Sequence, residues 1–133
     1  MEQNHILIAD DEEFLCVTIA DFLRDEGYKV TIVHDGTEVL PVLKLEKVDL
    51  VLLDLMMPHM NGLETLQLLK KHYPQTRVMI VSGYGSDENV QQAKQMGADG
   101  FVNKPFGVET LMRHVRTVIS HPPRQTIVEP PVG

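Results

Sequence analysis

The four residues Leu50-Val51-Leu52-Leu53 constrain the fold of this chain more than any other feature of its sequence. They form a short apolar run without the polar alternation of a strand that has one face in water. A strand of this kind is buried on both faces, which is typical of a parallel sheet covered by helices on each side. The run therefore predicts an α/β fold with a fully buried strand at residues 50–53.

Short apolar runs alternate along the chain with longer amphipathic segments. The apolar runs predict five strands, at residues 5–9, 29–33, 50–53, 77–81 and 100–102. Helical periodicity predicts five helices, near residues 12–26, 37–46, 62–72, 86–96 and 107–120. This alternation predicts a (βα)5 domain, a doubly wound parallel sheet with right-handed crossovers and helices on both faces.

Two of the expected helices have unusual sequences. Pro41 lies inside the second helix, where it removes a hydrogen bond, so we expect a bend or a late start there. The helix near residues 86–96 is weakly apolar, with Val90, Ala93 and Met96 as its main core candidates. Because little buried area is expected to hold it, this helix should be the one most free to shift.

Length, charge and composition bound the class of protein. The 133 residues suffice for one domain, which we place at 1–120, and the proline-rich segment 121–133 is predicted to be a tail or linker. The net charge of −7 argues against a nucleic-acid surface, which needs clustered Lys and Arg. No apolar run approaches the roughly 20 residues of a membrane span, and the N-terminus lacks a signal-peptide pattern, so we expect a cytoplasmic protein that binds no membrane.

Polar residues follow four of the five expected strands. Asp10 and Asp11 follow the first strand, Asp54 the third, Ser82 the fourth and Lys104 the fifth. The carboxyl ends of parallel strands meet at one edge of a sheet, where open α/β folds bind ligands. Carboxylates that lie close together repel one another unless a cation intervenes, and Mg²⁺ takes carboxylate, water and phosphate oxygens. An ionised Asp can attack phosphorus while Mg²⁺, an ammonium and a hydroxyl stabilise the phosphoryl oxygens, so the set predicts phosphoryl transfer.

Each of these residues taken alone has an ordinary structural explanation. An Asp pair after a strand is more often a helix cap, Ser82-Gly83 is a common turn, and a lone Lys is usually solvated. The functional interpretation depends on all of them occurring together at the correct ends of successive strands.

Four blocks of sequence resemble the signature segments of response-regulator receiver domains of two-component signalling. They are Ile-Leu-Ile-Ala-Asp-Asp-Glu (6–12), Leu-Leu-Asp-Leu-Met-Met-Pro-His-Met-Asn-Gly (52–62), Val-Ser-Gly-Tyr (81–84) and Gly-Ala-Asp-Gly-Phe-Val-Asn-Lys-Pro-Phe (97–106). The likeness covers residues 5 to about 120, with the blocks in order and at the family's spacing. It implies a flavodoxin-like fold whose five parallel strands follow the order 2-1-3-4-5.

The resemblance also implies roles for the residues at the strand ends. Asp54 would be the phosphoacceptor and a Mg²⁺ ligand, phosphorylated by a histidine kinase or phosphotransfer protein. Asp11 would bind Mg²⁺ directly, Asp10 largely through water, and Met56 through its backbone carbonyl. Lys104 would contact the phosphoryl group. Such a domain catalyses only its own phosphorylation and dephosphorylation, so we do not expect an enzyme with an external substrate.

The resemblance further implies an output switch. Ser82 would be the switch hydroxyl, coupled to an aromatic residue that is often Tyr in the family and is Phe101 here. Because Phe101 has no hydroxyl, we expect a modest bias between the two states. The output face would consist of the helix near 86–96, the strand 100–102 and the helix near 107–120. An output partner, an effector domain or a phosphorylation-dependent homodimer would bind there. Tyr84, two residues after Ser82, is a candidate modulator of dephosphorylation.

Other functions fit the sequence less well. A constitutive pseudo-receiver, which only binds other proteins, is the main alternative. A haloacid-dehalogenase-type phosphatase would need a second Asp two residues after the nucleophile, where this chain has Met56. A flavin-binding flavodoxin would not carry the acidic run 10–13 beside the flavin phosphate. The Met1 start favours a stand-alone or N-terminal receiver.

Overall fold

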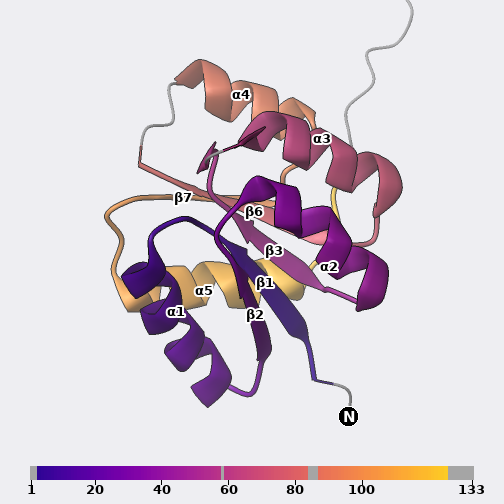
Figure 1. Ribbon diagram of the computed structural model, residues 1–133. Coiled ribbons are helices and arrows are strands. Elements are labelled where there is room, and N and C mark those ends of the chain that lie inside the picture. The colour runs from indigo at the N-terminus through magenta and orange to yellow at the C-terminus, as the bar shows by residue number, and fades with distance from the viewer. Residues whose placement is uncertain (1–2, 58, 84–86, 126–133) are drawn as a thin grey trace, which may run out of the picture.

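The computed structural model describes residues 3–57, 59–83 and 87–125, and its centre is a five-stranded parallel sheet (Figure 1). Its strands are β1 (His5–Ala9), β2 (Lys29–Val33), β3 (Leu50–Leu53), β6 (Arg77–Ser82) and β7 (Gly100–Asn103). They lie in the order β2-β1-β3-β6-β7, and every neighbouring pair is parallel. Counted within this sheet, the order is 2-1-3-4-5, so the predicted fold is confirmed.

Helices cover both faces of the sheet. They are α1 (Glu13–Asp25), the 3₁₀ turn η1 (Gly36–Glu38), α2 (Val39–Leu45), α3 (Gly62–His72), α4 (Asp87–Gln95) and α5 (Val108–Ile119). Helices α1 and α5 lie on one face, and α2, α3 and α4 lie on the other (Figure 1). None of the helices in the described part of the chain is long and apolar enough to cross a membrane.

Successive residues of β1 supply the two cores in turn. Ile6 and Ile8 pack in the core beneath α1 and α5, whereas Leu7 and Ala9 pack in the core beneath α2, α3 and α4. All four are at most 2% exposed, and β3 is likewise buried along its whole length. The double burial predicted from the unbroken apolar run at 50–53 is therefore correct. It fixes β1 and β3 in the middle of the sheet, which places their carboxyl ends side by side.

The second helix starts late, as its proline predicts. Asp35 caps the 3₁₀ turn by accepting a hydrogen bond from the backbone N–H of Thr37 at 2.9 Å. The α-helical part begins only at Val39, so Pro41 falls in its first turn, where a missing N–H removes no helical hydrogen bond. Helix α4 is also as weakly anchored as expected: Ala93 is fully buried, but Val90 and Met96 are only partly buried.

A small antiparallel hairpin, β4 (Met56–Met57) with β5 (Met60–Asn61), was not predicted from the sequence. It connects β3 to α3. Gly62 begins α3, and a Cβ atom there would lie 2.9 Å from the carbonyl oxygen of Leu55. The absence of a side chain therefore lets the hairpin pack directly on the start of α3, beside the carboxyl end of β3.

Candidate functional site

Three carboxylates meet at the carboxyl edge of the sheet. Asp10 and Asp11 follow β1, and Asp54 follows β3. One carboxylate oxygen of each lies within 4.8 Å of the others. Asp10 and Asp54 are each 4% exposed, whereas Asp11 is exposed to solvent. The backbone N–H of Asp54 donates to the carbonyl of Ala9 at 3.0 Å, so the ladder between β1 and β3 itself sets this close approach.

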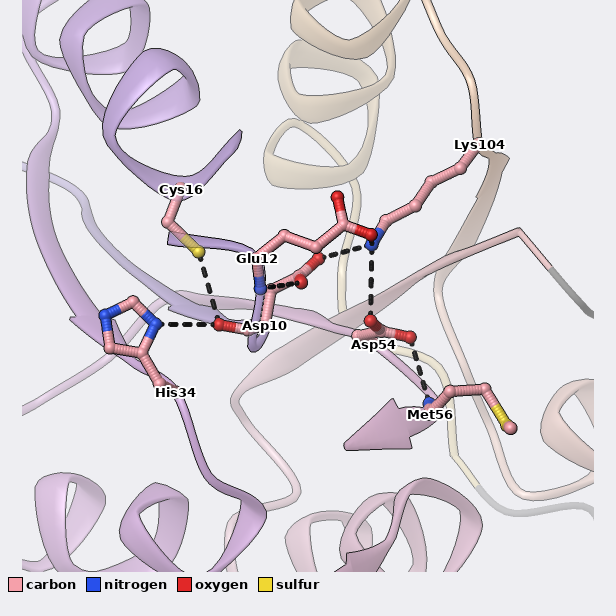
Figure 2. A network of polar contacts seen from close by, with 7 residues as sticks. All are labelled: Asp10, Glu12, Cys16, His34, Asp54, Met56 and Lys104. Atoms are coloured by element: carbon pink, nitrogen blue, oxygen red, sulfur yellow. Dashed lines mark hydrogen bonds and ion pairs between the residues drawn. The ribbon is translucent and has the colours of Figure 1, made fainter. Parts of the chain in front are cut away.

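Lys104 crosses the cluster from the loop after β7 (Figure 2). Its Nζ atom lies 2.7 Å from Asp10 Oδ2 and 3.2 Å from Asp54 Oδ2, with Glu12 Oε1 at 3.4 Å. Burial of the ammonium works against its charge, but hydrogen bonds and Coulombic attraction from Asp10 and Asp54 outweigh that cost and raise the pKa of Lys104. The side chain is therefore a cation that bridges two buried carboxylates.

Asp54 is held in one orientation by two donors. Its Oδ1 atom accepts a hydrogen bond from the backbone N–H of Met56 at 2.9 Å, and its Oδ2 atom accepts from Lys104. The pKa of the Asp54 carboxyl is raised, and burial is the largest cause. The hydrogen bond from the Met56 N–H lowers this pKa, repulsion from Asp10 raises it, and the Lys104 ammonium lowers it, but burial prevails. An additional positive charge at the cluster would favour the ionised form.

Asp10 is positioned by residues that the sequence analysis did not single out. Its Oδ1 atom accepts from the backbone N–H of Glu12 at 2.9 Å, while its carbonyl oxygen contacts Cys16 Sγ at 3.3 Å and His34 Nδ1 at 3.0 Å (Figure 2). His34 follows β2, the neighbour of β1, so strand adjacency could have indicated it. Burial raises the pKa of the Cys16 thiol to about 12, so Cys16 is a neutral, buried thiol of the core.

The donor set fits a hard divalent cation such as Mg²⁺. Its ligand atoms are carboxylate oxygens, and the exposed Asp11 leaves one side open for water. The Lys104 ammonium shows that the two buried carboxylates already balance a positive charge. A pocket of about 660 Å³ adjoins the cluster. It is lined by Asp11, Glu12, Leu15, Asp54, Met56, Gly83, Lys104, Pro105 and Phe106.

The remaining residues singled out in the sequence lie around this centre. Ser82 ends β6 with 4% of its surface exposed, and its register partner on β7 is Asn103. Met56 has an exposed side chain in the hairpin. Phe101 is partly buried against the core under α2, α3 and α4, with Lys94 Nζ 5.6 Å from its ring centroid. Tyr84 lies outside the described residues, so its suggested role stays a prediction.

Sequence and fold comparisons find related proteins along most of the chain. The family model described as "Response regulator receiver domain" matches residues 6–116. The uncharacterized transcriptional regulatory protein YkoG of Bacillus subtilis is 40% identical over 119 residues, which are 90% of this chain and 52% of that protein. This chain spans about half the length of the transcriptional regulatory proteins that it matches.

Solved structures of response-regulator proteins share the fold. A CheY-like response regulator receiver domain protein from Methanospirillum hungatei gives a TM-score of 0.86 at 30% identity, covering 90% of this chain and 95% of that one. A response regulator from Burkholderia pseudomallei, crystallised with a phosphorylated aspartic acid, a calcium ion and citrate, gives a TM-score of 0.80 at 30% identity, covering 89% of this chain and 69% of that one.

Proposed function

The chain belongs to the response-regulator receiver family of two-component signalling, and we propose that Asp54 accepts a phosphoryl group from a histidine kinase or phosphotransfer protein in a Mg²⁺-dependent reaction. One observation carries the proposal: Asp54 lies buried at the end of β3, within 4.8 Å of two further carboxylates and in contact with an ammonium. The phosphorylated aspartic acid and the calcium ion in the Burkholderia relative support it.

The reaction at Asp54 is a substitution at phosphorus. A carboxylate oxygen forms the new bond while the bond from phosphorus to the imidazole nitrogen of the donor breaks, and the imidazole leaves with the electron pair and takes up a proton. Asp10, Asp11, Asp54 and the Met56 carbonyl would hold Mg²⁺, which would neutralise charge on the phosphoryl oxygens. Lys104 would leave its present bridge to contact the incoming group, and the Met56 N–H would keep the Asp54 carboxylate oriented.

A receiver domain is a phosphoacceptor switch rather than an enzyme with an external substrate. The proposed output face consists of α4, β7 and α5, and it would bind an output partner, an effector domain or a second copy of the chain. Its described structure suits movement, because only Ala93 of α4 is fully buried. Ser82 and Phe101 lie on neighbouring strands, which would couple the phosphoryl group to α4 through Lys94 and the Phe101 ring.

Beryllofluoride, a mimic of the phosphoryl group, tests both halves of this proposal. With Mg²⁺ present, amide chemical shifts should change at Asp54 and also along residues 87–103. Phe101→Tyr should alter the distant changes while leaving those at Asp54 in place. Beryllofluoride without Mg²⁺ is the control and should change little. Changes confined to the neighbourhood of Asp54 would show that the proposed output face is wrong, and an absence of any change would favour a constitutive binding module.

The start of α1 is the proposed contact for the phosphoryl donor. Phe14 is 86% exposed and Val17 is 49% exposed, one and two turns beyond the Asp10-Asp11 pair. Exposed aromatic side chains beside a reactive site are typical of protein-binding surfaces. With any histidine kinase that labels this chain, Phe14→Ala should slow phosphotransfer by about tenfold, the equivalent of about 1.4 kcal/mol.

A small-molecule phosphoryl donor separates docking from chemistry in this experiment. Labelling of Phe14→Ala by acetyl phosphate should be unchanged, because the Phe14 side chain is 86% exposed to solvent and a small donor needs no docking surface. Leu45→Ala is the matched control, since Leu45 is also 86% exposed but lies on α2. Equal slowing with both phosphoryl donors would mean that Phe14 acts on the site itself and not on docking.

A further inference from the structure

The chain does not leave the domain freely at the end of α5. Arg77 Nε donates to the carbonyl of His121 at 2.6 Å. The backbone N–H of Arg124 donates to Asp99 Oδ1 at 2.5 Å, and its carbonyl accepts from Lys70 Nζ at 2.9 Å. Both main-chain groups of Arg124 are thus bound by side chains, and Figure 1 shows the yellow segment after α5 passing beside α3.

The two side chains that bind Arg124 form a buried ion pair. Lys70 Nζ and Asp99 Oδ2 lie 2.8 Å apart, and their side chains are 1% and 5% exposed. The ammonium also approaches the carbonyl of Thr76 at 3.5 Å, and Asp99 Oδ2 also accepts from the N–H of Val78 at 2.8 Å. Each proton of the ammonium therefore has an acceptor, and each carboxylate oxygen has a donor.

A buried ion pair adds little to stability compared with apolar residues of the same size, because two charges lose their water. This pair offers something that apolar residues cannot, namely an acceptor for an N–H and a donor for a carbonyl oxygen, side by side. The pair can therefore bind the main-chain N–H and the main-chain carbonyl of a single residue at the same time. The chain supplies the match, because Pro122 and Pro123 have no N–H and Arg124 is the first residue after His121 that can donate one.

The two partners of Arg124 come from different parts of the fold. Lys70 lies in the last turn of α3, and Asp99 lies between α4 and β7, two residues before Phe101. The N–H of Asp99 donates to the carbonyl of Val78 on β6 at 2.7 Å. Because Asp99 directly precedes β7 in the chain, a shift of α4 and β7 would move one half of the pair that holds Arg124.

We propose that residues 121–124 form a docked strap, clamped at Arg124 by Lys70 and Asp99, which fixes where the following chain leaves the domain and carries the movement of α4 and β7 to it. The docking of Arg124 on Lys70 and Asp99, which we call the clamp, is inferred from the contacts described above. The transmitted movement rests on the proposed function. The Pro-Pro pair is already extended and restricted, which lowers the entropic cost of docking.

Backbone ¹⁵N relaxation of the 133-residue chain tests the clamp. Order parameters at His121, Arg124 and Gln125 should be near the roughly 0.85 of a rigid backbone. Arg124→Pro removes the donated N–H and should lower the value at Gln125 below about 0.6. Gln125→Pro is the matched control, because it moves the same ring one residue further and should leave His121 and Arg124 rigid. Values below about 0.6 at these residues in the parent chain would overturn the clamp.

Lys70→Met tests the same clamp from the other side. It removes the donor to the Arg124 carbonyl and should release the strap, as Arg124→Pro does. Lys29→Met is its control, because Lys29 and Glu46 also pair at 2.8 Å but with side chains 53% and 41% exposed. A strap that stays rigid in Lys70→Met, in a chain that still folds, would count against the proposal.

Beryllofluoride separates the clamp from the signal. The amide shifts of His121, Arg124 and Gln125 should respond in the parent chain, and those of His121 and Gln125 should lose that response in Arg124→Pro. A response at Asp54 that never reaches the strap would overturn the transmitted movement and leave the proposed function intact. A rigid strap in a chain with no response at Asp54 would instead overturn the proposed function and leave the clamp.

Discussion

Asp54→Asn should abolish labelling of the chain by acetyl phosphate and Mg²⁺. An amide is no nucleophile toward phosphorus at neutral pH, and Asp10, the other buried carboxylate of the cluster, is held by the shorter contact to Lys104, at 2.7 Å against 3.2 Å for Asp54. Peptide mapping of the phosphorylated parent should find the phosphoryl group on Asp54 alone. Asp25→Asn, which changes an exposed residue of α1, should be labelled like the parent. Label that persists on a histidine in Asp54→Asn would indicate a relay role instead.

The same substitution should raise the melting temperature of the metal-free protein at neutral pH. The pKa of Asp54 is raised, chiefly by burial, so the protonated carboxyl suits the fold better than the carboxylate does. Stability from such a group is present below its ordinary pKa near 3.9 and is lost as the pH rises through the raised value. Asparagine carries no charge, so the variant does not lose this stability as the pH rises. Each kcal/mol gained in the free energy of unfolding raises the melting temperature by about 4 °C for a domain of this size.

Thermal melts in a chelator, at neutral pH and below pH 4, measure this effect. The advantage of Asp54→Asn should be present at neutral pH and should vanish in acid, where the parent carboxyl is protonated. A variant that melts well below the parent at neutral pH would mean that the Lys104 contact outweighs burial. The melts also show that loss of labelling in this variant is not a loss of the fold.

The sequence could predict the placement of residues that end strands, because parallel pairing fixes it. The unbroken run at Leu50–Leu53 predicts a strand in the interior of the sheet, and the neighbour β1 then brings Asp10 beside Asp54. The late start of α2 follows from Pro41 alone, since its ring restricts the local backbone. Both predictions depend only on local sequence or on the pairing of adjacent strands, and the structure confirms both.

Features that depend on close approach of distant segments were not predictable in this way. The β4–β5 hairpin needs the backbone of Leu55 to rest on Gly62, a contact that no sequence period signals. Lys70 and Asp99 lie 29 residues apart, on a helix and in a loop, and each looks like an ordinary surface charge in the sequence. The segment 121–133 was accordingly predicted as a plain tail or linker, although residues 121–124 contact the fold.

Lys104→Met should affect Mg²⁺ binding and phosphorylation in opposite directions. The ammonium bridges Asp10 and Asp54, so it competes with a divalent cation for the same carboxylates. Without it, Mg²⁺ should bind roughly tenfold more tightly, equivalent to about 1.4 kcal/mol. The rate of labelling by acetyl phosphate should nevertheless fall on the order of a hundredfold, because the phosphoryl oxygens lose a preorganised cation.

Stability gives an independent measure of the same competition. The raised pKa of Lys104 means that its ion pairs stabilise the fold below its ordinary pKa, hence fully at neutral pH, and that this stability is lost only in alkali. Lys104→Met should therefore melt below the parent in a chelator and gain more than the parent when Mg²⁺ is added. Lys104→Arg keeps the positive charge, so it should restore most of the melting temperature measured in a chelator. It should restore the rate of labelling less well, because a planar guanidinium replaces the compact ammonium. If Mg²⁺ binding and labelling instead weaken together in Lys104→Met, the ammonium supports the metal site and does not compete with it.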